Sequence, residues 1–146
     1  MTPTENAEQT ALFQWAELAS GAHPELRLLH AIPNGGLRDA RTAVTLKRTG
    51  VKSGVPDICL PVPRGGHGAL YIELKRQKGG VLSANQKVWL DRLNQAGNRA
   101  VVCKGWEAAR DTIMDYLGGK WLAAQTEIGG NCRRDGKKEE RKNAVE

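Results

Sequence analysis

Apolar residues recur at three- and four-residue spacing in four stretches of the chain, and this period predicts four helices. In the first stretch, Leu12, Trp15 and Ala19 fall on one stripe. In the third, Ser83 followed by Gln86 fits a capping box, in which each side chain bonds the backbone of the other residue. The predicted helices cover residues 6–20, 37–49, 83–96 and 106–117.

Shorter apolar runs bounded by glycine and proline predict the strands. They cover residues 26–32, 55–62, 69–75 and 99–103. A Gly-rich turn at 64–68 joins the second and third strands into a hairpin, and Pro61 predicts an edge or a bulge at the end of the second. The order α β α β β α β α predicts an α/β fold, with a small mixed central sheet flanked by helices.

The chain has 146 residues, which is the length of one ordinary domain. We expect this domain to cover residues 5–118. From 119 to 146 glycine and mixed charge replace most apolar residues, which predicts a charged, flexible tail. No apolar run approaches the length of about 20 residues that a membrane span requires, so no membrane association is expected.

The charge of the chain favours a polyanionic partner. Lys and Arg number 22 against 16 Asp and Glu, a formal net charge of +6. A soluble surface with surplus lysine is the alternative explanation. The three cysteines form no C-x-x-C pair, which argues against a disulfide framework and a zinc site. We therefore expect a reducing, cytoplasmic environment.

The most informative charges lie in the predicted hairpin. Side chains alternate along a strand, so Glu73 and Lys75 share one face of the third strand, and Asp57 can lie beside Glu73. The rest of that strand is apolar, and a strand buried on both faces rarely contains two charged residues. The alternative is a turn role for Asp57 and a solvated edge for the other two, with an ion pair worth about 0–1 kcal/mol.

Two converging carboxylates repel each other unless a positive charge lies between them. A hard divalent cation such as Mg²⁺ or Mn²⁺ suits carboxylate and carbonyl oxygens, and no cluster of histidine and cysteine points to zinc. Beside such a metal, Lys75 could orient an attacking water and neutralise charge on a phosphate. The hairpin therefore indicates metal-assisted phosphate chemistry.

Pro56-Asp57, a gap and then Glu73-x-Lys75 together resemble the core motif of the PD-(D/E)xK nuclease superfamily. The flanking sequence resembles the virus-type replication-repair nuclease family, VRR-Nuc, from about residue 8 to 117. The stretches that carry this resemblance include His30-Ala31-Ile32-Pro33-Asn34-Gly35-Gly36, Tyr71-Ile72-Glu73-Leu74-Lys75 and Leu82-Ser83-Ala84-Asn85-Gln86. The resemblance implies a restriction-endonuclease-like core.

The resemblance also implies roles for the matching residues. Asp57 and Glu73 would bind the metal, with the Leu74 carbonyl as a further oxygen ligand. Lys75 would be the catalytic lysine. Gln86 matches a glutamine that the family places near the active site, which is compatible with its capping box.

Two further matches have simpler alternatives. Glu8 matches an acid on the first helix that the family brings to the metal, and its place in line with the apolar stripe supports an inward orientation. The alternative is a favourable interaction with the helix dipole. Asn34 would lie near the site or the DNA path, or in a plain turn between strand and helix.

Basic side chains would supply phosphate contacts, which give affinity and salt dependence but do not read sequence. The expected DNA contacts are Asn34, Arg38, Arg41, Lys47, Arg48, Lys52 and Arg76. The resemblance implies a structure-selective DNA endonuclease that works as a homodimer on branched DNA such as four-way (Holliday) junctions. The alternatives are a flap- or end-directed nuclease, a DNA-binding module that does not cleave, and an RNA-directed protein.

Overall fold

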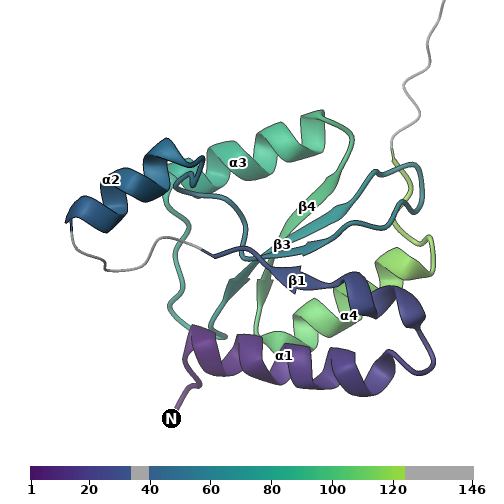
Figure 1. Cartoon of the computed structure of the whole chain (residues 1–146). Helices are drawn as coiled ribbons and strands as arrows, with labels where there is room; N and C mark the ends of the chain where they lie inside the picture. Colours follow the sequence, from purple (N-terminus) through teal and green to yellow (C-terminus); the bar gives the residue numbers. More distant parts are fainter. Residues whose placement is uncertain (34–39, 124–146) are drawn as a thin grey trace, which may run out of the picture.

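A four-stranded mixed sheet lies between helices in the computed structural model, which describes residues 1–33 and 40–123 (Figure 1). The strand order is β1-β2-β3-β4, with β1–β2 and β2–β3 antiparallel and β3–β4 parallel. The strands are β1 (His30–Ala31), β2 (Ile58–Leu60), β3 (Leu70–Lys75) and β4 (Arg99–Lys104). The helices are α1 (Glu5–Ala19), η1 (Pro24–Leu28), α2 (Ala40–Arg48), α3 (Ala84–Gln95) and α4 (Trp106–Leu117).

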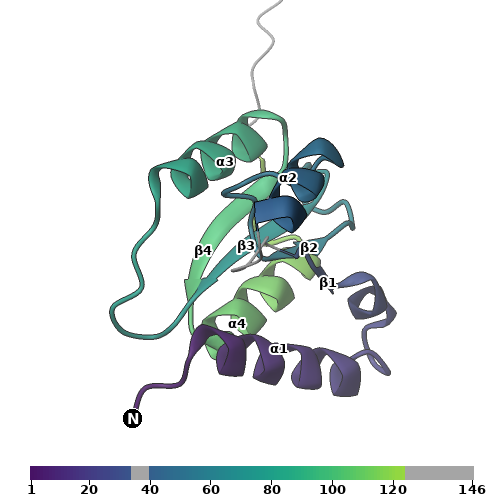
Figure 2. The ribbon, with the colours of Figure 1, turned by 60° about the vertical axis from the view of Figure 1, so that its left-hand side comes forward.

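The main hydrophobic core lies on the face of the sheet that α1 and α4 cover. These two helices pack together on that face, and α3, which connects the parallel strands β3 and β4, covers the opposite face (Figure 2). Alternation along β3 turns Leu70, Ile72 and Leu74 toward the core and Glu73 away from it. The core comprises Leu12, Ala16, Leu26, Leu29, Ile58, Leu60, Val62, Leu70, Ile72, Leu74, Cys103, Ala109, Ile113 and Tyr116.

Most predicted elements are present. The four helices begin and end within a few residues of their predicted bounds, although residues 37–39 of the second lie outside the described part. Ser83 and Gln86 form both bonds of the capping box at the start of α3. The hairpin joins β2 to β3, and β2 is shorter than predicted because Pro56 and Pro61 lie on either side of it. The predicted α/β class with a mixed sheet is confirmed.

The prediction of a strand at 26–32 is wrong for most of its length. Residues Pro24–Leu28 form a 3₁₀ helix, and only His30–Ala31 pair with β2. Proline is favoured in the first turn of a helix. The three-residue period of the 3₁₀ helix turns Leu26 and Leu29 into the core and leaves Leu28 half exposed. The apolar run that predicted a strand is therefore mostly helical.

The described chain continues past α4 onto the hairpin turn. Ala123 donates its N–H to the Gly65 carbonyl at 2.7 Å, and the Arg99 guanidinium lies 4.6 Å from the centroid of the Trp121 ring. Residues 120–123 are not helical. None of the helices within 1–33 and 40–123 is long and apolar enough to span a membrane.

Candidate active site

Asp57 and Glu73 lie next to each other where β2 begins and β3 ends. Ile58 pairs with Ile72, so the preceding and following residues, Asp57 and Glu73, occupy the next cross-strand position. Asp57 Oδ2 accepts a hydrogen bond of 2.8 Å from the Leu74 backbone N–H. Glu73 is 2% exposed. The hairpin thus brings together the two carboxylates that the alternation of side chains predicted.

One oxygen of Glu73 accepts two bonds. Lys75 Nζ lies 3.1 Å from Glu73 Oε1, and Gln86 Nε2 donates to the same atom at 2.8 Å. Gln86 Oε1 accepts from the Ser83 N–H at 2.8 Å, so the capping box fixes the glutamine amide while its other end holds Glu73. The Gln86 side chain therefore completes the capping box and contacts Glu73 at the same time.

The electrostatics of the carboxylate pair follow from burial and mutual repulsion. Burial and the charge of the nearby Asp57 raise the pKa of Glu73 from 4.5 to about 7, and the hydrogen bond and charge of Lys75 oppose this rise. Burial also raises the pKa of Asp57, opposed by the Leu74 hydrogen bond and by Lys75. Without a cation, the pair therefore retains a proton close to neutral pH.

The donor set fits a hard divalent cation. Glu73 Oε2 is buried and has no hydrogen-bond partner, although Oε1 of the same group has two. The N–H and C=O of one residue in an extended strand point to the same edge, so the Leu74 carbonyl faces the side on which its N–H meets Asp57. An orphaned carboxylate oxygen beside a second carboxylate and a carbonyl is the set that Mg²⁺ or Mn²⁺ prefers.

Glu8 bonds the start of α4. It is 1% exposed, and its Oε2 accepts the Trp106 N–H at 2.8 Å, at the first residue of α4. Its Oε1 is buried without a partner. Within 1–33 and 40–123, no group of three or more His, Cys, Asp or Glu side chains is arranged to hold a metal ion. The inward orientation of Glu8 is confirmed, but its observed bond stabilises a helix N-terminus.

Sequence reasoning missed Glu5. Glu5 Oε1 lies 4.0 Å from Lys75 Nζ, and its charge contributes to the raised pKa of Asp57. The side chain is 49% exposed, so it lies at the mouth of the site. Both Glu5 and Glu8 belong to the first two turns of α1. The sequence favoured Glu8, the acid in line with the apolar stripe, and gave no sign that Glu5 would lie within 4.0 Å of Lys75.

Gly54 fixes how the start of β2 meets α3. Its φ is +89°, and a Cβ at this position would lie 2.7 Å from the Asn85 backbone carbon. Next to it, Asn85 Nδ2 donates to Ser53 Oγ at 3.3 Å. Because Asn85 adjoins Gln86 and Gly54 precedes Asp57 by three residues, this close approach sets the distance between the two segments that carry the site.

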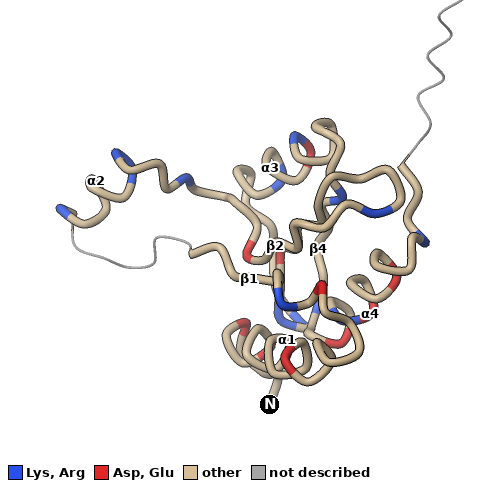
Figure 3. The backbone as a smooth tube through the Cα atoms, turned by 45° about the vertical axis from the view of Figure 1, so that its right-hand side comes forward, with Lys and Arg blue, Asp and Glu red and all other residues tan. Residues whose placement is uncertain are grey.

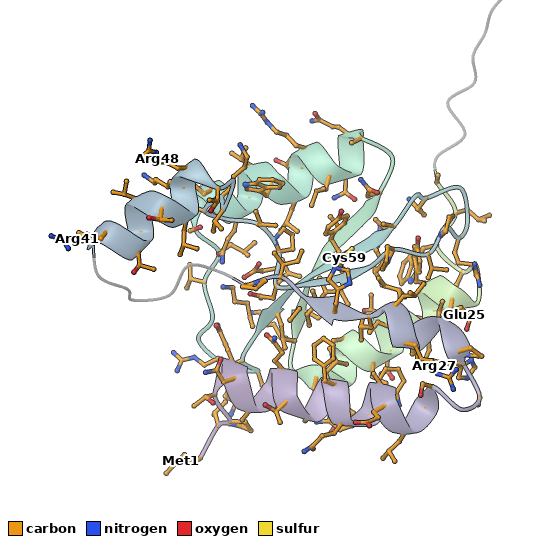
Figure 4. All side chains as sticks on the ribbon, viewed as in Figure 1. Met1, Glu25, Arg27, Arg41, Arg48 and Cys59 are labelled. Carbon is orange, nitrogen blue, oxygen red and sulfur yellow. The ribbon has the colours of Figure 1, made fainter. Side chains whose placement is uncertain are left out.

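The expected DNA contacts lie at several places. Asn34 and Arg38 fall outside the described residues. Arg41, Lys47, Arg48 and Lys52 are exposed on α2 and the segment after it. No residue of α2 is buried, and the helix carries basic but no acidic residues (Figure 3). The side chains of Arg41 and Arg48 point away from the sheet (Figure 4). Arg76 is exposed directly after β3.

Comparisons with known proteins agree with this geometry. The model of the VRR-NUC domain family matches residues 3–107. A solved structure described as a VRR_NUC domain protein superposes with a TM-score of 0.67 at 26% sequence identity. The superposition covers 81% of this chain and 91% of that one. No curated protein matches the chain.

Proposed function

The chain belongs to the VRR-NUC domain family, a nuclease-type family, and on this premise we propose that it is a divalent-metal-dependent, structure-selective DNA endonuclease. One observation carries the proposal: beside half-buried Asp57, the buried Glu73 has an unpartnered carboxylate oxygen, and buried Lys75 contacts the same glutamate. A solvated strand edge would expose these charges, and a fold without catalytic function gains nothing from burying them.

The residues of the site divide the chemistry among them. Asp57, Glu73 and the Leu74 carbonyl would hold Mg²⁺ or Mn²⁺, which supplies positive charge to the phosphate and acidifies water. Lys75 Nζ, held at 3.1 Å from Glu73, would orient the attacking water and neutralise charge that develops on the phosphate. Gln86 would keep the Glu73 carboxylate in one orientation through the 2.8 Å bond.

Glu8 has a different part in this proposal. Its carboxylate would hold α1 against the start of α4 through the Trp106 N–H, instead of ligating the metal. Glu5, which faces Lys75 from the mouth of the site, would be the acid of α1 nearest to the reacting phosphate. Both acids would thus contribute, one to the fold and one to the charge of the site.

Charge supports DNA as the substrate. The chain carries a net charge of +6. Exposed Arg41, Lys47 and Arg48 make α2 a positively charged helix that contains no acidic residue. Lys52, after α2, and Arg76, at the end of β3, are also exposed. Such side chains bind phosphates without reading bases, which favours recognition of DNA shape. We propose branched DNA, such as a four-way junction, bound by a homodimer whose two-fold symmetry matches that of the junction.

One cleavage assay tests the activity. The full chain is incubated with a four-way junction, a flap, a linear duplex and a single strand, in Mg²⁺, Mn²⁺ or EDTA. The matched variants are Lys75→Ala and Lys104→Ala, because these lysines pair across β3 and β4 but Lys104 is exposed. We expect metal-dependent cutting of the junction that Lys75→Ala loses and Lys104→Ala keeps.

The other outcomes of the assay are informative. Cutting mainly at flaps or ends would retain the site and reject the junction. DNA binding without cutting in either metal would reject the catalytic assignment in favour of a binding module. Metal binding is tested separately by the rise in thermal unfolding midpoint with Mn²⁺, which Asp57→Asn should abolish and the exposed Asp91→Asn should preserve. Light scattering of the free protein and the complex tests the dimer.

A further inference from the structure

We infer that Gly80 is a positioning residue for Lys75, because the loop at 76–82 lies against the stem of this lysine at a point where only glycine leaves room. The inference rests on the proposed function, since it concerns the lysine to which catalysis is assigned. Gly80 itself would touch neither DNA nor metal. It would act by confining the lysine side chain to one conformation.

The contact is closer than any ordinary side chain permits. A Cβ at Gly80 would lie 2.8 Å from Lys75 Cβ, 3.2 Å from Cδ and 3.3 Å from Cγ. The nearest of these atoms is fixed to the backbone of β3, so it cannot rotate away. Gly80 is not among the glycines with positive φ, so its backbone conformation is open to other residues. Space beside Lys75 is therefore the reason for glycine here.

The loop at 76–82 makes a second close contact, between Gln77 and Gly105. Gly105, between β4 and α4, lies under the Gln77 side chain, and a Cβ there would be 2.9 Å from Gln77 Cγ. The Gly105 N–H also donates to the Lys75 carbonyl at 2.8 Å. Gly105 thus holds the backbone of Lys75, and Gly80 allows the loop to pack against the Lys75 side chain.

These contacts explain an unusual burial. The Lys75 side chain is only 8% exposed, although lysine is among the residues least often buried and has a long flexible stem. Its stem is covered by Gly80, and its amino group lies between Glu73 at 3.1 Å and Glu5 at 4.0 Å. A methyl group at position 80 must push the stem or the loop, and either movement shifts Nζ relative to Glu73.

Displacement of a reacting group by about 1 Å can lower a rate about 100-fold. We therefore expect Gly80→Ala to lower kcat by about 10- to 100-fold, with KM for DNA and the Mn²⁺-induced rise in unfolding midpoint unchanged. The matched control is Gly21→Ala, because a Cβ at Gly21 meets nothing within 4 Å. A merely structural defect would lower the unfolding midpoint and would not separate kcat from KM.

A second measurement does not depend on activity. Reductive methylation of the folded full chain, read by mass spectrometry of peptides, reports how accessible each lysine amine is. In the wild type Lys75 should react at least about 10-fold more slowly than exposed Lys104, and Gly80→Ala should remove most of this protection while Gly21→Ala keeps it.

The outcomes separate the two proposals. Equal reactivity of Lys75 and Lys104 in the wild type, or unchanged protection and kcat in Gly80→Ala, would overturn the positioning role and leave the nuclease intact. Protection that Gly80→Ala removes, in a protein that cuts no DNA, would support the positioning of the lysine and refute the proposed function. If Gly80→Ala does not fold, equal reactivity of Lys75 and Lys104 in the wild type would still overturn the positioning role.

Discussion

Glu73→Gln should stabilise the protein at pH 8 while abolishing its activity. The pKa of Glu73 is about 7 against an ordinary value of 4.5. One pKa unit corresponds to about 1.4 kcal/mol, so the buried charge costs the folded state about 3 kcal/mol above pH 7. Glutamine removes this charge and keeps an oxygen that can accept from Lys75 and Gln86, and its amide can donate to Asp57.

The direction of the pH dependence follows from the same pKa. The folded state holds the Glu73 proton more tightly than the unfolded chain does. As the pH rises from about 4.5 to 7, the unfolded chain loses this proton first, so the wild type loses stability across that window. Below pH 4.5 both states are protonated, and wild type and variant should have nearly equal unfolding free energies.

The assay is urea unfolding of the metal-free full chain, followed by tryptophan fluorescence at pH 4.5 and at pH 8. We expect the variant to exceed the wild type by about 3 kcal/mol at pH 8, within a factor of two, and by less than 1 kcal/mol at pH 4.5. Glu17→Gln, on the exposed side of α1, is the control and should change neither value. A variant no more stable than the wild type at pH 8 would refute the reasoning.

Three further predictions concern the parts around the pair. Glu8→Ala should lower the free energy of unfolding by about 2–4 kcal/mol, because it leaves a cavity and an unpaired Trp106 N–H. Glu8→Gln should lower it by less. Loss of Mn²⁺ binding in a stable Glu8→Gln protein would instead make Glu8 a metal ligand. Gly54→Ala should cost about 2–4 kcal/mol in urea unfolding, because of its positive φ and the 2.7 Å approach to Asn85, and an unchanged midpoint would contradict this. Arg48→Ala should lower the slope of log affinity against log salt by about 0.9 in fluorescence anisotropy, whereas an unchanged slope would place α2 away from DNA.

The sequence predicted that Asp57, Glu73 and Gln86 lie close together, because their arrangement depends on local geometry. Two-residue alternation in β3 and the hairpin together bring Asp57 beside Glu73, and the capping box directs the Gln86 side chain at the first turn of α3. These are contacts over short sequence distances, in which the chain has few conformations to choose from.

What the sequence did not predict depends on contacts between distant segments. The partner of Glu8 is the Trp106 amide, and Glu5 was overlooked because nothing local indicates that Lys75 would face it. The leucines of 26–32 show a second limit, since a short apolar run fits a strand or a helical turn equally well until the core selects which side chains it buries.

The bond between Glu8 and Trp106 joins residues that are 98 positions apart, and it connects the first helix of the domain to the last. Closing so long a loop is slow, so this contact should form after the hairpin and α3 have assembled. Its loss should then act on the lifetime of the native state more than on the speed of folding. In stopped-flow measurements, Glu8→Ala should raise the unfolding rate and leave the refolding rate nearly unchanged; slower refolding would mean that the two ends of the domain meet early.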